Sequence, residues 1–182
     1  MTKGEHEYRT WPLPEIRVIG EGEERQISWY AAKFDSLSEP MLGFRERIGR
    51  RAFTKTIQEH DIRALFNHNP NYVLGRNKSG TLDLTVDLHG LRAATTPPDT
   101  QWARDLVVSI ERSDISGGSF GFDVIRDRWL TIEENELIRE LQEVRLFDVS
   151  LVTYPAYPAT EGIAIRSMFA ELDIPMEDLV LD

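Results

Sequence analysis

The sequence predicts a single domain of the α+β class that is mostly β. Its 182 residues are enough to bury one hydrophobic core. Residues 81–86 alternate strictly, with Leu82, Leu84 and Val86 on one side, as in a half-buried strand. Glycine and proline turn signals separate about seven strand-like segments from two or three helical ones, without regular strand–helix alternation. This order favours antiparallel pairing.

The other elements follow from local patterns. Residues 1–14 are a predicted loose arm, because this stretch is polar and its two prolines exclude a helix. Helices are predicted over 49–60 and 101–112, where apolar residues recur every four positions. Residues 130–140 are acidic enough for a helix but also suit one arm of a long hairpin. The other predicted strands are 15–19, 26–34, 61–68, 119–124 and 146–152.

Composition excludes several classes of function. The chain has no cysteine, which rules out disulfides, zinc–thiolate sites, iron–sulfur clusters and a cysteine nucleophile. Thirty-one acidic against 21 basic residues give a charge of −10, which argues against nucleic-acid binding. No apolar run reaches the ~20 residues of a membrane span, and no signal peptide is visible. We therefore expect a cytoplasmic protein that binds neither nucleic acid nor membrane.

The C-terminal residues 168–182 differ from the rest. They contain no base, and their acids interleave with apolar side chains. This segment is either a solvated terminus or a removable or partner-binding peptide. We therefore divide the chain into an N-terminal arm at 1–14, a domain at 15–167 and an acidic tail at 168–182.

Without cysteine, the strongest available nucleophile is a serine or threonine assisted by a base. His68 ends an apolar strand, where a catalytic base and a satisfied core or turn histidine are both open interpretations. Ser119 follows two glycines, which let a substrate carbonyl approach the backbone closely, although glycine–serine turns are also common. Residues 117–121 have the spacing of a nucleophile elbow, but a strand follows where an elbow needs a helix, so the α/β-hydrolase interpretation fails.

Asp148 lies within an apolar strand, and alternation puts it on one face with Leu146 and Ser150. A carboxylate buried there needs a partner. That partner is either a histidine ring, as in a catalytic triad, or Arg145 or Arg63 in a salt bridge, unless the strand is an exposed edge. No metal-ligand spacing, phosphate loop or dinucleotide fingerprint occurs, and we expect no metal and no cofactor.

A set of short segments, in a fixed order over roughly residues 28–160, resembles the prohead maturation proteases of tailed phages. The matching segments are Gly43–Ile48 with Ala52-Phe53, Arg63–Pro70, Leu74–Arg76, Ser79–Leu84, Gly90-Leu91, Asp114–Phe122 and Val144–Pro158. Each segment is weak alone, but the ordered set is specific. The resemblance implies a fold like that of the herpesvirus assembly protease, an antiparallel β-barrel flanked by helices.

The resemblance also implies residue roles. Ser119 would be the nucleophile, His68 the general base and Asp148 the third member, where many relatives have a glutamate. Glu143 is the reserve for the third position. Backbone N–H groups around Gly118, Phe120 and Gly121 are the oxyanion-hole candidates.

The implied function is a serine endopeptidase of procapsid maturation. Its substrates would be the phage scaffold protein and scaffold segments of the major capsid protein, followed by self-cleavage. It would act inside the procapsid in the bacterial host cytoplasm, and a homodimer is possible. Two alternatives differ in class: a non-catalytic assembly module on the same fold, and an unrelated β-rich binding domain with Trp29 and Tyr30 as surface anchors.

Overall fold

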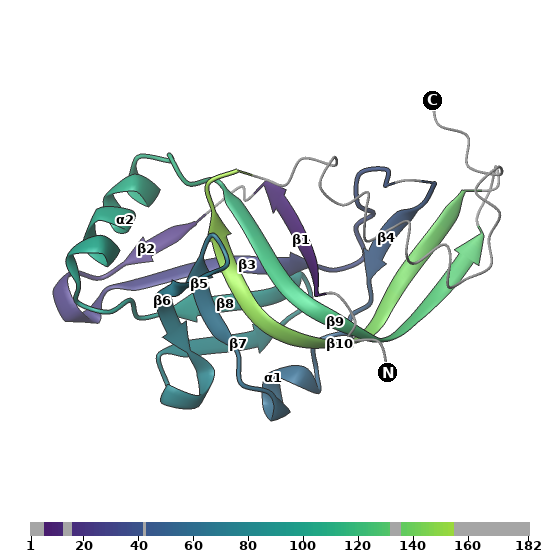
Figure 1. The fold of residues 1–182 in the computed structure, drawn as a ribbon, viewed down its shortest axis with the longest axis horizontal. Coiled ribbons are helices and arrows are strands. Elements are labelled where there is room, and N and C mark those ends of the chain that lie inside the picture. The colour runs from purple at the N-terminus through teal and green to yellow at the C-terminus, as the bar shows by residue number, and fades with distance from the viewer. Residues whose placement is uncertain (1–5, 13–15, 42, 132–135, 155–182) are drawn as a thin grey trace.

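The structure, a computed structural model, describes residues 6–12, 16–41, 43–131 and 136–154 (Figure 1). The predicted α+β, mostly β class is confirmed over these residues. The strands are β1 (Glu7–Pro12), β2 (Arg17–Ile19), β3 (Gln26–Lys33), β4 (Arg45–Ile48), β5 (Arg63–Phe66), β6 (Asn69–Arg76), β7 (Leu82–Val86), β8 (Gly90–Thr95), β9 (Gly117–Thr131) and β10 (Leu137–Val152). The helices are α1 (Thr56–Glu59) and α2 (Gln101–Glu111), with short 3-10 turns at Gly22–Glu24 and Asn77–Ser79.

The strands form two sheets. One has the order β1-β9-β10-β5-β6, with β4 also paired to β10, and the other has the order β2-β3-β8-β7. Most pairs are antiparallel, as predicted, but β10 pairs in parallel with both β4 and β5. The predicted barrel is not confirmed, because neither sheet closes on itself within the described residues. Instead, β4 and β5 share one edge of the long strand β10, and β1 and β6 remain as edge strands.

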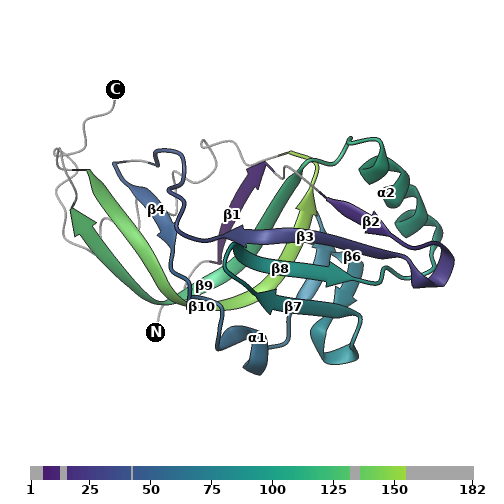
Figure 2. The same ribbon diagram turned by 180° about the vertical axis from the view of Figure 1, so that it is seen from behind.

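The hydrophobic core lies between the two sheets (Figure 2). β9 contributes Phe120 and Phe122, β3 contributes Trp29, and α2 closes one end with the apolar side of its helix, including Leu106 and Ile110. Trp29 is 2% exposed, so it is a core residue rather than the surface anchor that a β-rich binding domain would need. The described helices include none that is both long enough and apolar enough to cross a bilayer.

Two segments differ from their predictions because they pair with the large sheet. Residues 7–12, expected in a loose arm, form β1 along β9. Most of 49–60, expected to be helical, forms turns, and only α1 is an α-helix. Two oxygen atoms of the segment accept hydrogen bonds from β10: Val144 donates its N–H to the Ala52 carbonyl at 3.1 Å, and Leu146 donates its N–H to the Thr56 hydroxyl at 2.9 Å.

The described parts of the ambiguous segment 130–140 are strand rather than helix: residues 130–131 end β9 and residues 137–140 begin β10, and these two long strands pair antiparallel (Figure 1). Their ladder shifts register at three places, one of them between Leu146 and Asp148. Phe147 is the extra residue there, as in a β-bulge, which bends a strand and turns its side chains. The acidic tail and the end of the resembling segments, beyond residue 154, lie outside the described residues.

Candidate active site

His68 lies in a tight turn rather than at the end of a strand. Asn67 and His68 are the two residues between β5 and β6, where Phe66 pairs with Asn69. Their φ angles are 53° and 54°. A two-residue hairpin loop with both φ values positive is the type I′ geometry, which asparagine tolerates and histidine adopts less readily. From this turn the His68 ring contacts Asp148 and Ser150 on β10 and Ser119 on β9.

Asn67 fixes this turn to the neighbouring strand. Its backbone N–H donates to the Leu151 carbonyl at 2.9 Å, and its side-chain oxygen accepts the Thr153 N–H at 2.9 Å. Its side-chain NH2 group also donates to the Thr153 hydroxyl at 3.1 Å. The position of His68 is therefore set by bonds that tie its neighbour to the end of β10.

The β9–β10 ladder brings the other site residues together. Ser119 on β9 lies opposite Ser150 on β10, and Gly121 lies opposite Asp148. The bulge at Phe147 separates Leu146 from this face, since Leu146 lies opposite the core residue Phe122 instead. The expectation that Leu146 and Asp148 share a face is wrong for this reason. Because of the bulge, Leu146 packs in the core and Asp148 lies in the candidate site.

Gly121 is required where it stands. A Cβ atom at this position would lie 2.6 Å from Asp148 Oδ2 and 2.8 Å from Tyr8 Cε1. Both distances are shorter than real Cβ contacts. The missing side chain leaves the space in which the carboxylate and the tyrosine ring lie.

Ser119, His68 and Asp148 form a continuous hydrogen-bonded series. His68 Nε2 is 2.6 Å from Ser119 Oγ, and His68 Nδ1 is 2.6 Å from Asp148 Oδ1. Asp148 is 7% exposed and forms an ion pair with His68, whereas Arg63 pairs with Asp61. Arg145, the other arginine named as a partner, has its guanidinium over the Phe147 ring. Of the partners weighed for Asp148, the structure thus places the histidine there.

Ser150 is a site residue that the sequence analysis did not single out. Its hydroxyl donates to Asp148 Oδ1 at 2.6 Å and lies 3.2 Å from His68 Nδ1. It is fully buried. Its spacing of two residues from Asp148 on the same strand was the available signal.

β1 supplies two further residues that sequence reasoning missed. The Thr10 hydroxyl donates to Ser119 Oγ at 2.9 Å. The Tyr8 ring meets the His68 ring edge to face, with centroids 4.5 Å apart. Burial, and then the negative charge of Asp148, raise the pKa of the Tyr8 hydroxyl above its usual value. No local sequence signal links either residue to the site, because pairing between distant strands creates the contact.

The oxyanion-hole candidates lie in the middle of the sheet. Gly118, Phe120 and Gly121 each have one partner on β10 and one on β1. Successive residues of a strand direct their backbone groups to opposite neighbours. The N–H groups on the β1 side are therefore engaged with that strand or face it.

Glu143 lies away from this site. Its carboxylate is 3.3 Å from Lys55 Nζ and 4.0 Å from Arg126 Nη2. The other histidines also lie elsewhere: His60 contacts Thr56 at the end of α1, and His6 contacts Asp123. The structure brings together the three first-choice residues and not the reserve.

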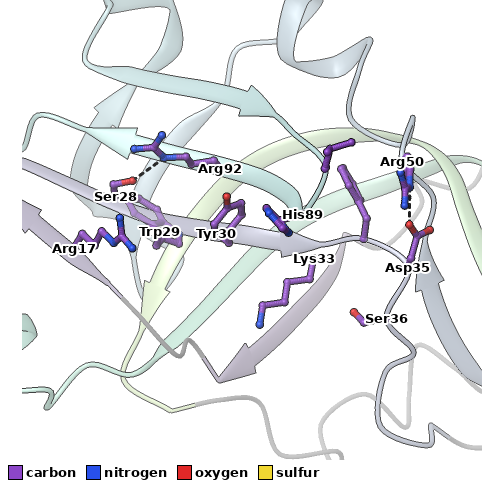
Figure 3. A pocket seen from close by; sticks show the side chains of 12 residues that line it. Arg17, Ser28, Trp29, Tyr30, Lys33, Asp35, Ser36, Arg50, His89 and Arg92 are labelled. Atoms are coloured by element: carbon purple, nitrogen blue, oxygen red, sulfur yellow. Dashed lines mark hydrogen bonds and ion pairs between the residues drawn. The ribbon is translucent and has the colours of Figure 1, made fainter.

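A pocket of about 680 Å³ lies on the outer side of the smaller sheet (Figure 3). Tyr30, His89 and Arg92 are among its lining residues, and none of the three triad candidates is. The Tyr30 hydroxyl donates to Asp87 at 2.7 Å, and the Arg92 guanidinium donates to the Ser28 hydroxyl at 3.1 Å. The pocket holds no hydrogen-bonded nucleophile and base. Nor does any cluster of three metal-binding side chains occur in the described part of the chain.

A serine hydroxyl, an imidazole and a carboxylate in hydrogen-bonded series are the arrangement of a serine hydrolase. The chain belongs to the caudovirus prohead serine protease family, whose model matches residues 13–173. Its fold is similar to that of the capsid assembly protease gp21 of bacteriophage T4, with a TM-score of 0.53 and 11% sequence identity. That similarity covers 82% of this chain and 98% of the T4 chain. No curated protein matches the sequence.

Proposed function

We propose that the chain is a serine endopeptidase in which Ser119 is the nucleophile, His68 the general base and Asp148 the residue that orients the imidazole. The two 2.6 Å contacts of the His68 ring carry this proposal. These distances leave no room for a bridging water, so the Asp148 carboxylate contacts the ring directly although aspartate is shorter than the glutamate of many relatives. An assembly module without activity would have no need of this arrangement.

The proton transfers follow from the contacts. When Nδ1–H donates to Asp148, the lone pair on Nε2 is free to accept the Ser119 proton. Ser119 Oγ then attacks the peptide carbonyl carbon, and His68 returns the proton to the leaving amine as the C–N bond breaks. Water, activated by the same imidazole, releases the acyl group. A protonated imidazole cannot accept the serine proton, so the reaction requires the neutral form of His68.

Ser150 supports the acid. Its hydroxyl donates to the same Asp148 oxygen that faces His68. This hydrogen bond fixes the orientation of the carboxylate, which stabilises the imidazolium formed during the reaction. We therefore assign Ser150 a positioning role.

Family membership supports the choice of substrates. We propose that the enzyme cleaves the phage scaffold protein and the scaffold segments of the major capsid protein inside the procapsid, in the host cytoplasm. Self-cleavage would follow. The T4 neighbour, a capsid assembly protease, is consistent with this setting.

The test uses purified full-length chain with a fluorophosphonate probe and with co-expressed scaffold protein. Ser119→Ala should fold, remain unlabelled and leave the scaffold uncut. Ser109→Ala is the matched control, because Ser109 lies on α2 and its hydroxyl bonds to the Asp105 carbonyl rather than to the candidate site. This variant should behave as wild type. Scaffold cleavage by Ser119→Ala at the wild-type rate would refute the assignment of the nucleophile.

A further inference from the structure

β1 runs along the nucleophile strand with Thr10 directly opposite Ser119 and Tyr8 opposite Gly121. The pairing is antiparallel and covers all six residues of β1. On its other side β9 pairs with β10, so β1 occupies the remaining edge of β9 beside the candidate nucleophile. An extended peptide that approached Ser119 by strand addition would use this same edge.

The nucleophile is closed off in this arrangement. Ser119 is 0% exposed, and the Thr10 hydroxyl donates a hydrogen bond to its Oγ. A reacting carbonyl carbon must come within about 3–3.5 Å of Oγ. The Thr10 hydroxyl lies 2.9 Å from Oγ, where a carbonyl carbon would have to approach, and its hydrogen bond engages one of the two Oγ lone pairs.

We propose that the β9 edge from Gly117 to Phe122 is the binding site for an extended peptide substrate, and that β1 occupies it as an intramolecular substitute. This inference rests on the proposed function. The enzyme is latent while β1 is docked and becomes active when β1 leaves the edge. The N–H groups of β9 that face β1 then become available to a substrate strand and to the oxyanion.

The docked strand also indicates what side chain the site selects. Arg9 places its Nε 2.6 Å from one oxygen of Glu46 and its Nη2 2.9 Å from the other, as a two-pronged pair. The Glu46 side chain is 3% exposed, and Arg139 also contacts it at 3.3 Å. A substrate strand in place of β1 would present a side chain to Glu46 from the residue that precedes the one opposite Ser119. We infer that this residue is basic.

Three features make β1 exchangeable. Its C-terminal end continues into the domain, whereas its N-terminal end is held by the exposed pair of His6 and Asp123 at 2.9 Å. The indole N–H of Trp11 is buried and finds no hydrogen-bond partner among the described residues, which weakens the docking. β1 also precedes the segment, 13–173, that matches the family.

A reversible lock tests the proposal in the full-length chain. The double variant His6→Cys/Asp123→Cys introduces the only two thiols, since the sequence has no cysteine. Residues 6 and 123 directly follow the Glu7–Phe122 pair in the antiparallel register, and their side chains are in contact at 2.9 Å, so a disulfide between them is a reasonable design. The readout is the rate at which a fluorophosphonate labels Ser119, with the disulfide verified by mass spectrometry. The single variants under the same oxidant are the controls.

We expect the reduced double variant to be labelled and the oxidised form to be labelled at least ten-fold more slowly, with recovery on reduction. Equal rates in the two forms would overturn the proposal and leave the proposed function standing. A faster rate in the oxidised form would also overturn it, because β1 would then be part of the active machinery. Absence of labelling in wild type and in every reduced form would instead refute the proposed function.

A second pair of variants tests the same point without a disulfide. Arg9→Ala removes the contact with Glu46, and Arg9→Lys retains a positive charge without the two-pronged geometry. Labelling should be fastest for Arg9→Ala, intermediate for Arg9→Lys and slowest for wild type, with melting temperatures reported for all three.

A synthetic peptide with the sequence of residues 6–12 should slow the labelling of Arg9→Ala, and the same peptide with alanine for arginine should do so less. Equal effects of the two peptides would overturn the basic preference.

Discussion

The β9–β10 ribbon has two very different neighbours at the candidate active site. On the β10 side, β5 pairs through buried Ala64 and Leu65, and Asn67 ties the following turn to the end of β10. On the β9 side, β1 pairs through residues that are partly or fully exposed, and charged side chains hold it. The first neighbour carries the proposed base and is part of the core. The second covers the proposed nucleophile, and we propose that it is exchanged for substrate. The two neighbours thus separate the residues proposed to perform the chemistry from those proposed to control access to it.

The sharpest way to test the β10 side is Asp148→Asn. An amide in place of the carboxylate disfavours the ring tautomer that leaves Nε2 free to accept a proton, so we expect kcat to fall by about 10⁴-fold, with little change in fold. Turnover of the scaffold substrate measures this. Asp83→Asn, an exposed position on β7, is the matched control. A large loss with Glu143→Gln and none with Asp148→Asn would move the third role to Glu143.

The next largest effect is expected on stability, from a substitution of Arg139. Arg139 is 4% exposed and contacts Glu7, Glu46 and Asp127. Arg139→Ala leaves the buried Glu46 with less compensation, so the free energy of unfolding should fall by about 3–5 kcal/mol. Urea unfolding followed by circular dichroism measures it.

Arg128→Ala is the control for that loss, because the Arg128 side chain is 54% exposed in its pair with Glu140. Its expected cost is about 0–1 kcal/mol. Similar costs for Arg139→Ala and Arg128→Ala would show that the buried charges do not hold this region together. β1 would then be held on β9 by backbone hydrogen bonds alone.

The smallest expected effect concerns Glu7 and pH. Burial alone would raise the pKa of its carboxyl, but the positive charges of Arg9 and Arg139 outweigh burial and lower the pKa below 4.5. A group whose pKa is lower in the folded than in the unfolded state stabilises the fold above the unfolded value and loses that contribution as pH falls through the folded value. Glu7→Gln should therefore be less stable than wild type at pH 7, and the difference should shrink below about pH 4.5. Urea unfolding between pH 3 and 7 checks this, and a constant difference would contradict it.

Local periodicity predicted the elements that are determined locally. The strand at 82–86 and the helix at 101–111 follow from apolar residues that recur with the period of each structure. The glycines before Ser119, and the carboxylate within an apolar strand at Asp148, marked two candidate residues without any pairing information. The resemblance to a protease family then linked them to His68.

What the sequence did not predict depends on contacts between distant segments. Thr10 and Ser119 are 109 positions apart, and nothing in residues 7–12 indicates which strand they join. The bulge at Phe147 breaks the regular alternation from which the neighbours of Asp148 were derived. His68 was assigned to a strand because the positive φ angles of its turn follow from the geometry of the β5–β6 hairpin rather than from an obvious glycine signal.

The two-residue loop at Asn67 and His68 has a consequence for how this chain tolerates length changes. Surface hairpins commonly accept extra residues at their tips. Here one inserted residue would shift the imidazole by up to the roughly 3.3 Å spacing of an extended chain, more than the length of either of its hydrogen bonds. This hairpin should therefore keep a fixed number of residues, although it lies at the periphery of the sheet.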